Sequence, residues 1–167
     1  MAKLSRRIKI VLLLIVGLVA AKTIFFRAPS EDQMIAHFRQ HKAEFEQLRA
    51  MLLEDKQIMM IGSDWLRSRD WDLPDNSEEI GVSRQRLADY HALMNTLDVA
   101  PIGGDDDYVQ FNRFGGGFTD ATWGIGYAWS RKPPETIVKS AYWHKPIMRG
   151  RRVHSHIEGN WYIFQRR

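Results

Sequence analysis

The chain has no cysteine among its 167 residues. This absence excludes disulfide bonds, thiol nucleophiles, thiolate-bound metal ions and a lipidated cysteine within the chain. Internal repeats and low-complexity tracts are absent as well. Six tryptophan, five tyrosine and eight phenylalanine residues supply large apolar groups for a core, so a disordered chain is also excluded.

Acidic residues are missing from the first 29 positions, which carry six lysine and arginine residues. The remaining 138 residues hold 18 basic and 20 acidic side chains, so the sequence pI near 9.5 does not indicate nucleic-acid binding. Charge is uneven within this part, −9 over residues 30–130 and +7 over residues 131–167. The two halves can neutralise each other in the fold. Alternatively, Arg149, Arg151 and Arg152 form a basic patch that meets an anionic surface such as lipid headgroups.

A basic stretch at residues 3–9 precedes an uninterrupted apolar run over residues 10–21. This pattern is typical of a secretory signal. Because cations resist translocation, the four before the run and the two after it predict an N-terminus in the cytoplasm and the bulk of the chain outside.

The apolar segment is either cleaved before Lys22 or continues to residue 26 as an uncleaved helical anchor, and the anchor is the interpretation that we favour. Its 17 residues from position 10 to position 26 reach the lower limit for crossing a hydrocarbon core. The side chains expected in the membrane include Ile10, Leu14, Leu18, Phe25 and Phe26. The sequence therefore predicts a signal-anchor over residues 1–29 and a single soluble domain over residues 30–167.

Two amphipathic helices are predicted in the first half of that domain. Ser30 is an expected N-cap, with Gln33 completing a capping box, and apolar residues at helical spacing extend this helix to about Asp55. Residues 58–61 form a short apolar strand, and residues 63–81 are predicted to be mostly loop. A second helix begins at Ser83 and ends before the glycines and aspartates of residues 103–107.

Strands dominate the second half. The candidates are residues 108–114, residues 121–130, residues 137–144 and a hairpin over residues 153–166 that turns at Gly159-Asn160. In the second of these, large and small residues alternate, which predicts a core face bearing Trp123, Ile125, Tyr127 and Trp129. Sugar binding by these aromatic rings is the alternative. The predicted fold is α+β: the anchor helix, then two helices packed on a mostly antiparallel sheet of about five strands.

The closing segment HIEGNWYIF, which follows a helix and glycine-rich aromatic strands, resembles the end of an uncharacterised family of small bacterial envelope proteins, many of them lipoprotein-like. The likeness covers nearly all of residues 30–167. Because the lipidated cysteine is missing here, a helical anchor would have to replace the lipid. The resemblance implies a bacterial protein of the cell envelope and supplies no catalytic residue. The charge-flanked anchor adds the finer expectation, a single-pass protein of the inner membrane with its domain on the periplasmic side.

A metal site is one alternative for the closing hairpin. On a regular strand His154, His156 and Glu158 point to one face, and two imidazoles with a carboxylate are a known zinc set. His144 would be a fourth ligand if its strand lay alongside. Imidazole rings packed against an aromatic side chain explain the same pattern without a metal.

The remaining motifs indicate structure rather than chemistry. Asp105, Asp106 and Asp107 lack the alternating ligands of a calcium loop and are expected in a solvated turn. The glycines at 115–117 lack the features of a phosphate loop and are expected to connect a hairpin. We find no nucleophile motif and no convergent acid–base set.

The sequence therefore predicts a membrane-anchored, extracytoplasmic and non-catalytic module that binds an envelope protein or a wall component. The candidate binding residues are Trp161, Arg149, Arg151 and Arg152. A metal-dependent hydrolase using His154, His156 and Glu158 is the alternative. No cofactor and no nucleic-acid partner are expected.

Overall fold

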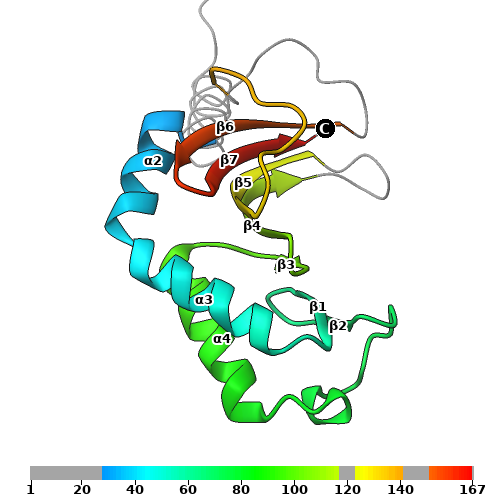
Figure 1. Cartoon of the computed structure of the whole chain (residues 1–167). Helices are drawn as coiled ribbons and strands as arrows, with labels where there is room; N and C mark the ends of the chain where they lie inside the picture. The colour runs from blue at the N-terminus through cyan, green and yellow to red at the C-terminus, as the bar shows by residue number, and fades with distance from the viewer. Residues whose placement is uncertain (1–27, 117–122, 141–150, 167) are drawn as a thin grey trace, which may run out of the picture.

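The computed structural model describes residues 28–116, 123–140 and 151–166. Its helices are α2 (Glu31–Gln40), α3 (Lys42–Glu54) and α4 (Arg84–Leu97), with a 3₁₀ helix, η1, at Ser77–Ile80. Its strands are β1 (Ile58–Ile61), β2 (Leu66–Ser68), β3 (Ile102–Gly104), β4 (Tyr108–Gly116), β5 (Trp123–Ser130), β6 (Arg152–Glu158) and β7 (Trp161–Arg166). The strands form one antiparallel sheet in the order β2-β1-β3-β4-β5-β7-β6, with the helices along one side (Figure 1). The predicted α+β fold is confirmed.

The predicted anchor lies outside the described residues, and so do the side chains that we expect in the membrane, from Ile10 to Phe26. None of the helices in the described ranges is long and apolar enough to cross a bilayer.

The first predicted helix is two helices, because the chain breaks at His41, where φ is −116° and ψ is 25°. The predicted capping box is present: the hydroxyl of Ser30 accepts from the backbone N–H of Gln33 at 3.2 Å, and the side chain of Gln33 accepts from the N–H of Ser30 at 2.7 Å. The bend lets α2 and α3 follow the curved sheet, so that Phe38 before it and Phe45 after it both reach the same core.

An aromatic cluster fills the space between these helices and the sheet. The ring of Phe38 lies 5.0 Å from that of Trp161, and the ring of Phe45 lies 4.7 Å from Tyr127 and 5.5 Å from Phe111. These tilted and edge-on contacts suit the ring quadrupoles. The predicted core face of β5 is confirmed for Ile125 and Tyr127, which are buried. It is wrong for Trp123, which is 40% exposed at the start of the strand, and Trp129 is half-buried.

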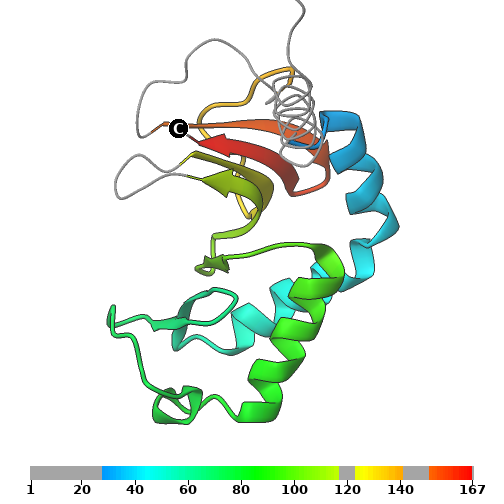
Figure 2. The same cartoon turned by 180° about the vertical axis from the view of Figure 1, so that it is seen from behind.

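Several short elements differ from the prediction. Within the expected loop at 63–81, β2 pairs with β1 and η1 forms a single turn. Residues 102–104, expected to be a turn, form β3 because they pair with both β1 and β4. In the described part of the strand expected at 137–144, a single parallel bridge joins Ile137 to His154. Figure 2 shows the β1–β2 hairpin at the end of the molecule away from β6 and β7.

Two predicted turns are confirmed, whereas the hairpin connection expected at the glycines of 115–117 is wrong for the first two, which pair with β5. Asp105 accepts hydrogen bonds from the backbone N–H groups of Asp107 and Tyr108, each at 2.9 Å, so the aspartate run is the turn between β3 and β4. Gly159 takes φ of 52° in the β6–β7 turn, a backbone conformation that favours glycine. Of the three glycines at 115–117, the first two belong to β4 and Gly117 lies outside the described residues.

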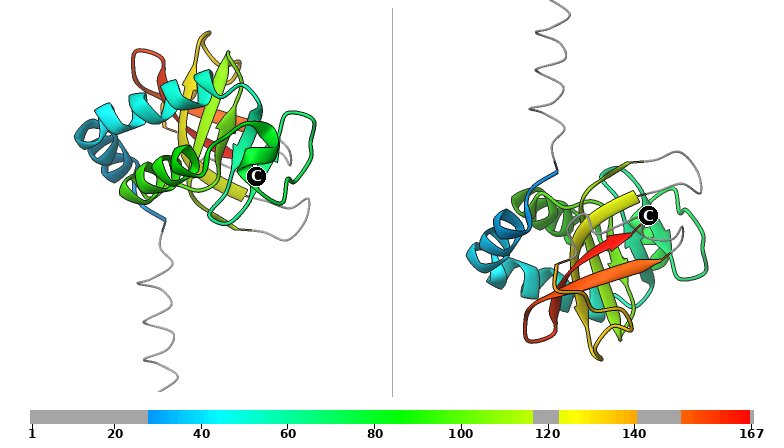
Figure 3. Two further views of the ribbon diagram at one scale, coloured as in Figure 1. Left: turned by 90° about the horizontal axis from the view of Figure 1, so that it is seen from below. Right: turned by 90° about the horizontal axis from the view of Figure 1, so that it is seen from above.

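The sheet has a second face, directed away from α3 and α4, which both lie across the other side (Figure 3). We call it the far face. Strand pairing assigns to it Tyr108, Gln110, Asn112, Gly124, Gly126, Ala128, Ser130, Arg152, His154, His156, Tyr162, Phe164 and Arg166.

The far face is strongly coiled. Tyr108 begins β4 and Arg152 begins β6, three strands away and at the opposite end of the ladder. On a flat sheet their backbones would lie roughly 20–25 Å apart, further than the two side chains can span. Here the guanidinium carbon of Arg152 is 5.5 Å from the centroid of the Tyr108 ring. Two diagonal corners of the β4-β5-β7-β6 sheet therefore meet above this face.

The aromatic cluster generates the first prediction. Trp161 is 3% exposed, so Trp161→Ala leaves a large cavity and should lower the free energy of unfolding by about 3–5 kcal/mol in urea titrations. Trp71→Ala is the matched control because Trp71 is 67% exposed, and its cost should stay below about 1 kcal/mol. Equal losses in the two variants would contradict the placement of Trp161.

Candidate functional site

The proposed metal trio is not brought together. His154 and His156 stand opposite Phe164 and Tyr162, but a β-bulge follows and Glu158 stands opposite Trp161. The bulge moves Glu158 to the helix side of the sheet, so the expectation that all three side chains share one face is wrong.

Glu158 has its own partners on the helix side. The ammonium of Lys42 lies 2.5 Å from its carboxylate and the guanidinium of Arg39 lies 3.8 Å away. The hydrogen bond from Lys42 holds the pKa of Glu158 below its usual value. Among the residues that the structure describes, no group of three histidine or acidic side chains is arranged to hold a metal ion, and His144 lies outside them.

The candidate binding residues fall in different places. Trp161 belongs to the core, where its indole N–H donates to Glu46 at 2.7 Å, so its ring offers no surface to a partner. Arg149 lies outside the described residues. Arg151 is exposed, and Arg152 lies on the far face.

Arg152 is part of a group that we call the Arg–Tyr–His cluster, formed by Arg152, Arg166, Tyr108 and His154. The hydroxyl of Tyr108 lies 3.1 Å from Nε2 of His154, and their rings meet edge to face at 5.9 Å. Arg152 and Arg166 are direct cross-strand partners on β6 and β7. Four side chains from three strands thus converge where the corners of the sheet meet.

Burial governs the electrostatics of this cluster. It raises the pKa of Tyr108 and lowers the pKa of His154 and of Arg166. The charge of Arg152 acts on all three groups, opposing the rise at Tyr108 and adding to both falls. His154 is therefore a neutral imidazole at neutral pH, and the positive charge resides on the two arginines.

Several polar atoms around the cluster have no hydrogen-bond partner among the described residues. Nε of Arg166 is buried without a hydrogen bond, and so is Oε1 of Gln110, a residue only 6% exposed. A Cβ atom at Gly124 would lie 3.7 Å from Oδ1 of Asn112 and 3.9 Å from Nε of Arg166, so both groups lie close to this glycine. Neither Arg152 nor Arg166 has a carboxylate of the described residues within 4.0 Å.

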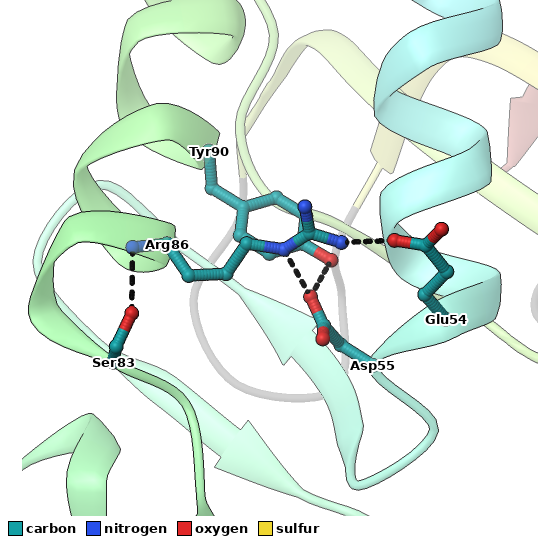
Figure 4. Close-up of polar contacts among 5 residues, drawn as sticks. All are labelled: Glu54, Asp55, Ser83, Arg86 and Tyr90. Atoms are coloured by element: carbon teal, nitrogen blue, oxygen red, sulfur yellow. Dashed lines mark hydrogen bonds and ion pairs between the residues drawn. The ribbon is translucent and has the colours of Figure 1, made fainter.

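The arginine between α3 and α4 shows the opposite situation (Figure 4). Arg86 donates from Nε to Asp55 at 2.7 Å and from its terminal nitrogen to Glu54 at 2.6 Å. The hydroxyl of Tyr90 donates to the same Asp55 carboxylate at 2.8 Å. The two carboxylates compensate the charge of Arg86, and the contacts join α3 to α4, so the role of this group is structural.

Sequence reasoning missed Tyr108, Gln110 and Arg166 as site residues. The sequence gives a partial signal for Arg166, because this residue lies almost as far after the predicted Gly159-Asn160 turn as Arg152 lies before it. The signal is incomplete because only the bulge places the two residues directly opposite each other, and a regular hairpin would not. Tyr108 joins them through the coil of the sheet, for which strand periodicity gives no signal.

Comparisons of the chain with protein-family models, with curated proteins and with solved structures find no match.

A second polar cluster lies on the helix side. The hydroxyl of Tyr127 donates to the carbonyl of Met34 at 3.1 Å, accepts from Arg113 at 2.8 Å and lies 3.1 Å from Nδ1 of His37. Burial, together with the charges of Arg113 and His41, lowers the pKa of His37 from 6.5 to about 4. The folded state therefore favours neutral His37.

This depressed pKa generates the second prediction. The unfolded chain binds the proton of His37 at higher pH than the folded chain, so the stability that this group contributes is present above pH 6.5 and is lost as the pH falls towards 4. We expect His37→Gln to reduce the loss of unfolding free energy between pH 7 and pH 4 by about 2 kcal/mol. Parallel curves for the wild type and His37→Gln would contradict the assignment.

Proposed function

We propose that the protein is a non-catalytic binding module of the bacterial envelope, held at the inner membrane by residues 1–29 with residues 30–167 on the periplasmic side. The charge-flanked apolar run supports the location, since cations before such a run retain the N-terminus in the cytoplasm. The likeness of the HIEGNWYIF segment to small envelope proteins supports it as well.

The binding role is carried by one observation, the unpartnered polar groups of the far face. A buried polar group without a hydrogen bond destabilises a fold by about 1–3 kcal/mol. Such atoms occur singly elsewhere, at Arg67 and His91 for example. On the far face three of them, in Gln110, His154 and Arg166, share one surface with the exposed residue Arg152. Natural proteins retain local violations of this kind mainly at functional sites.

The composition of the site supports binding over catalysis. Nε2 of His154 is already engaged by Tyr108, and His154 has no carboxylate partner among the described residues. A histidine base is normally oriented by such a third group. The cluster instead offers hydrogen-bond donors and positive charge, which hold a ligand.

A binding site and a structural cluster respond differently to mutation, which gives the third prediction. Arg166→Met keeps the apolar stem and removes an unpaired charge, so the free energy of unfolding should stay within about 0.5 kcal/mol of the wild type or rise. Arg86→Met is the matched control: it separates a guanidinium from Asp55 and Glu54 and should cost about 2 kcal/mol in the same urea titrations. A loss at Arg166 as large as that at Arg86 would mean that Arg166 supports the fold.

The location gives the fourth prediction. Alkaline phosphatase fused after Arg167 should be active in bacterial cells, and a reporter that works only in the cytosol should be inactive at the same position. Replacing Lys3, Arg6, Arg7 and Lys9 with glutamine removes the cationic flank and should weaken this orientation. A fusion active only in the cytosol would defeat the proposed location and leave the binding site to be explained in another compartment.

A further inference from the structure

We propose that the Arg–Tyr–His cluster binds a phosphate group, held by the guanidinium groups of Arg152 and Arg166 and the hydroxyl of Tyr108. This inference rests on the proposed binding function and names the ligand of the same site.

The first support is the charge of the site. Like charges directly opposite each other on neighbouring strands destabilise a sheet, and Arg152 faces Arg166 in this way. Burial adds to the cost at Arg166, where it opposes the charged form. An anion between the two guanidinium groups would remove both penalties, since each would gain charge-assisted hydrogen bonds.

The second support is the contrast with other arginines. Arg49, Arg86 and Arg113 each have a carboxylate within 4.0 Å, from Glu46, Asp55 and Asp98 respectively. Arg67 and Arg69 also have no carboxylate within 4.0 Å among the described residues, but each stands alone: Arg67 lies over the ring of Trp71, and Arg69 donates to the carbonyl of Lys56. Arg152 and Arg166 differ because the two cations face each other across the hairpin and the described residues supply an acid to neither. The missing counter-charge is what a ligand would bring.

The third support is the supply of donors. Nε of Arg166 is buried and has no acceptor, and a guanidinium presents its donors in a planar fork that fits two oxygens of a phosphate. The hydroxyl of Tyr108 lies beside both arginines. When Nε2–H of neutral His154 donates to this hydroxyl, the single hydroxyl proton is free to donate to a phosphate oxygen. Because Arg152 is exposed, a ligand can approach the cluster from solvent on its side.

The choice of phosphate over a simple carboxylate follows from charge matching. Two arginines bring two positive charges, and neutral His154 adds none. A phosphate monoester carries about −1.5 to −2 near neutral pH, whereas one carboxylate carries a single negative charge and would leave the other arginine uncompensated. Two hollows of the described surface also contain basic side chains, but acids outnumber them in both. One is lined by Lys56, Arg69 and Asp105–Asp107, and the other by Glu54, Arg86 and Asp89.

A phosphate group could come from a soluble compound or from the headgroup of an anionic phospholipid. The fifth prediction separates these sources in the intact chain, reconstituted in lipid nanodiscs. In nanodiscs of zwitterionic phosphatidylcholine, we expect inorganic phosphate to bind saturably in calorimetric titrations. The competing lipid is phosphatidic acid, whose headgroup is a phosphate monoester, and phosphatidylglycerol, an anionic diester, is the control for surface charge. Apparent phosphate affinity should be at least threefold lower in phosphatidic acid than in phosphatidylglycerol nanodiscs if headgroups compete for the site, and should be equal in the two if the natural source is soluble.

Variants connect this binding to the cluster. Arg166→Met and Arg152→Met should each weaken phosphate binding at least tenfold, because each removes one of the two guanidinium groups. Arg151→Met is the matched control, because Arg151 is exposed and precedes Arg152 in the chain. The phosphate affinity of this variant should stay within twofold of the wild-type value. Unfolding midpoints of all three variants verify that they are folded. Tyr108→Phe, which keeps the ring beneath Arg152, should weaken binding several-fold.

Three results would overturn the inference. They are the absence of saturable phosphate binding in phosphatidylcholine nanodiscs, phosphate affinity that Arg166→Met leaves unchanged, and acetate binding as tightly as phosphate at the same ionic strength. None of these results bears on the reporter fusions. If the reporter is periplasmic but phosphate does not bind, the proposed ligand is wrong and the proposed location stands. If phosphate binds but the reporter is cytosolic, the proposed location is wrong and the proposed ligand stands.

Discussion

The coil of the sheet depends on the close approach of backbone to backbone along β5. A Cβ atom at Gly126 would lie 2.1 Å from the carbonyl oxygen of Phe111 and 2.9 Å from the ring of Phe164, separations that side chains do not tolerate. Glycine at this position therefore lets the Phe164 ring settle onto β5 while the strands rotate tightly against one another. From this rotation follow both the bend between α2 and α3, which wraps one side, and the meeting of Tyr108 with Arg152 on the other.

The two faces of the sheet are stabilised differently. On the helix side, the aromatic rings of Phe38, Phe45 and Trp161 exclude water, and the polar groups among them find partners such as Glu46. On the far face, Phe164 and Tyr162 are buried beside amides and cations whose atoms are not all satisfied. The helix side also contains an unpartnered atom, Oε1 of Gln165, but its aromatic packing is dense. A well-packed core on one side can carry a strained polar site on the other, because local destabilisation of a few kcal/mol is tolerated when the rest of the fold is well packed.

Much of the fold could be predicted because local chemistry determines it. The capping box at Ser30, the N-cap at Ser83, the alternation in the middle of β5 and the turn at Gly159 each depend on a few neighbouring residues, and the structure confirms all four. What could not be predicted depends on contacts made at a distance. Strands β2 and β3 are three residues each, too short for periodicity to show, and exist because β1 and β4 pair with them. The break between α2 and α3 at His41 contains no proline or glycine from which it could be predicted, and it follows the shape of the sheet instead.

The site shows how a single residue can reverse the chemistry expected from a motif. Strict alternation would place the carboxylate of Glu158 beside the two imidazoles of His154 and His156, a set suited to a cation. The bulge at Ile157 turns Glu158 to the helix side, where Lys42 neutralises it. The same one-residue shift sets Arg152 directly opposite Arg166. The bulge thus removes one acid from the far face and aligns two arginines on it, so that the face is positively charged and suited to an anion rather than to a cation. Strict alternation predicts the wrong ligand because it fails in β6, the strand that contains the bulge.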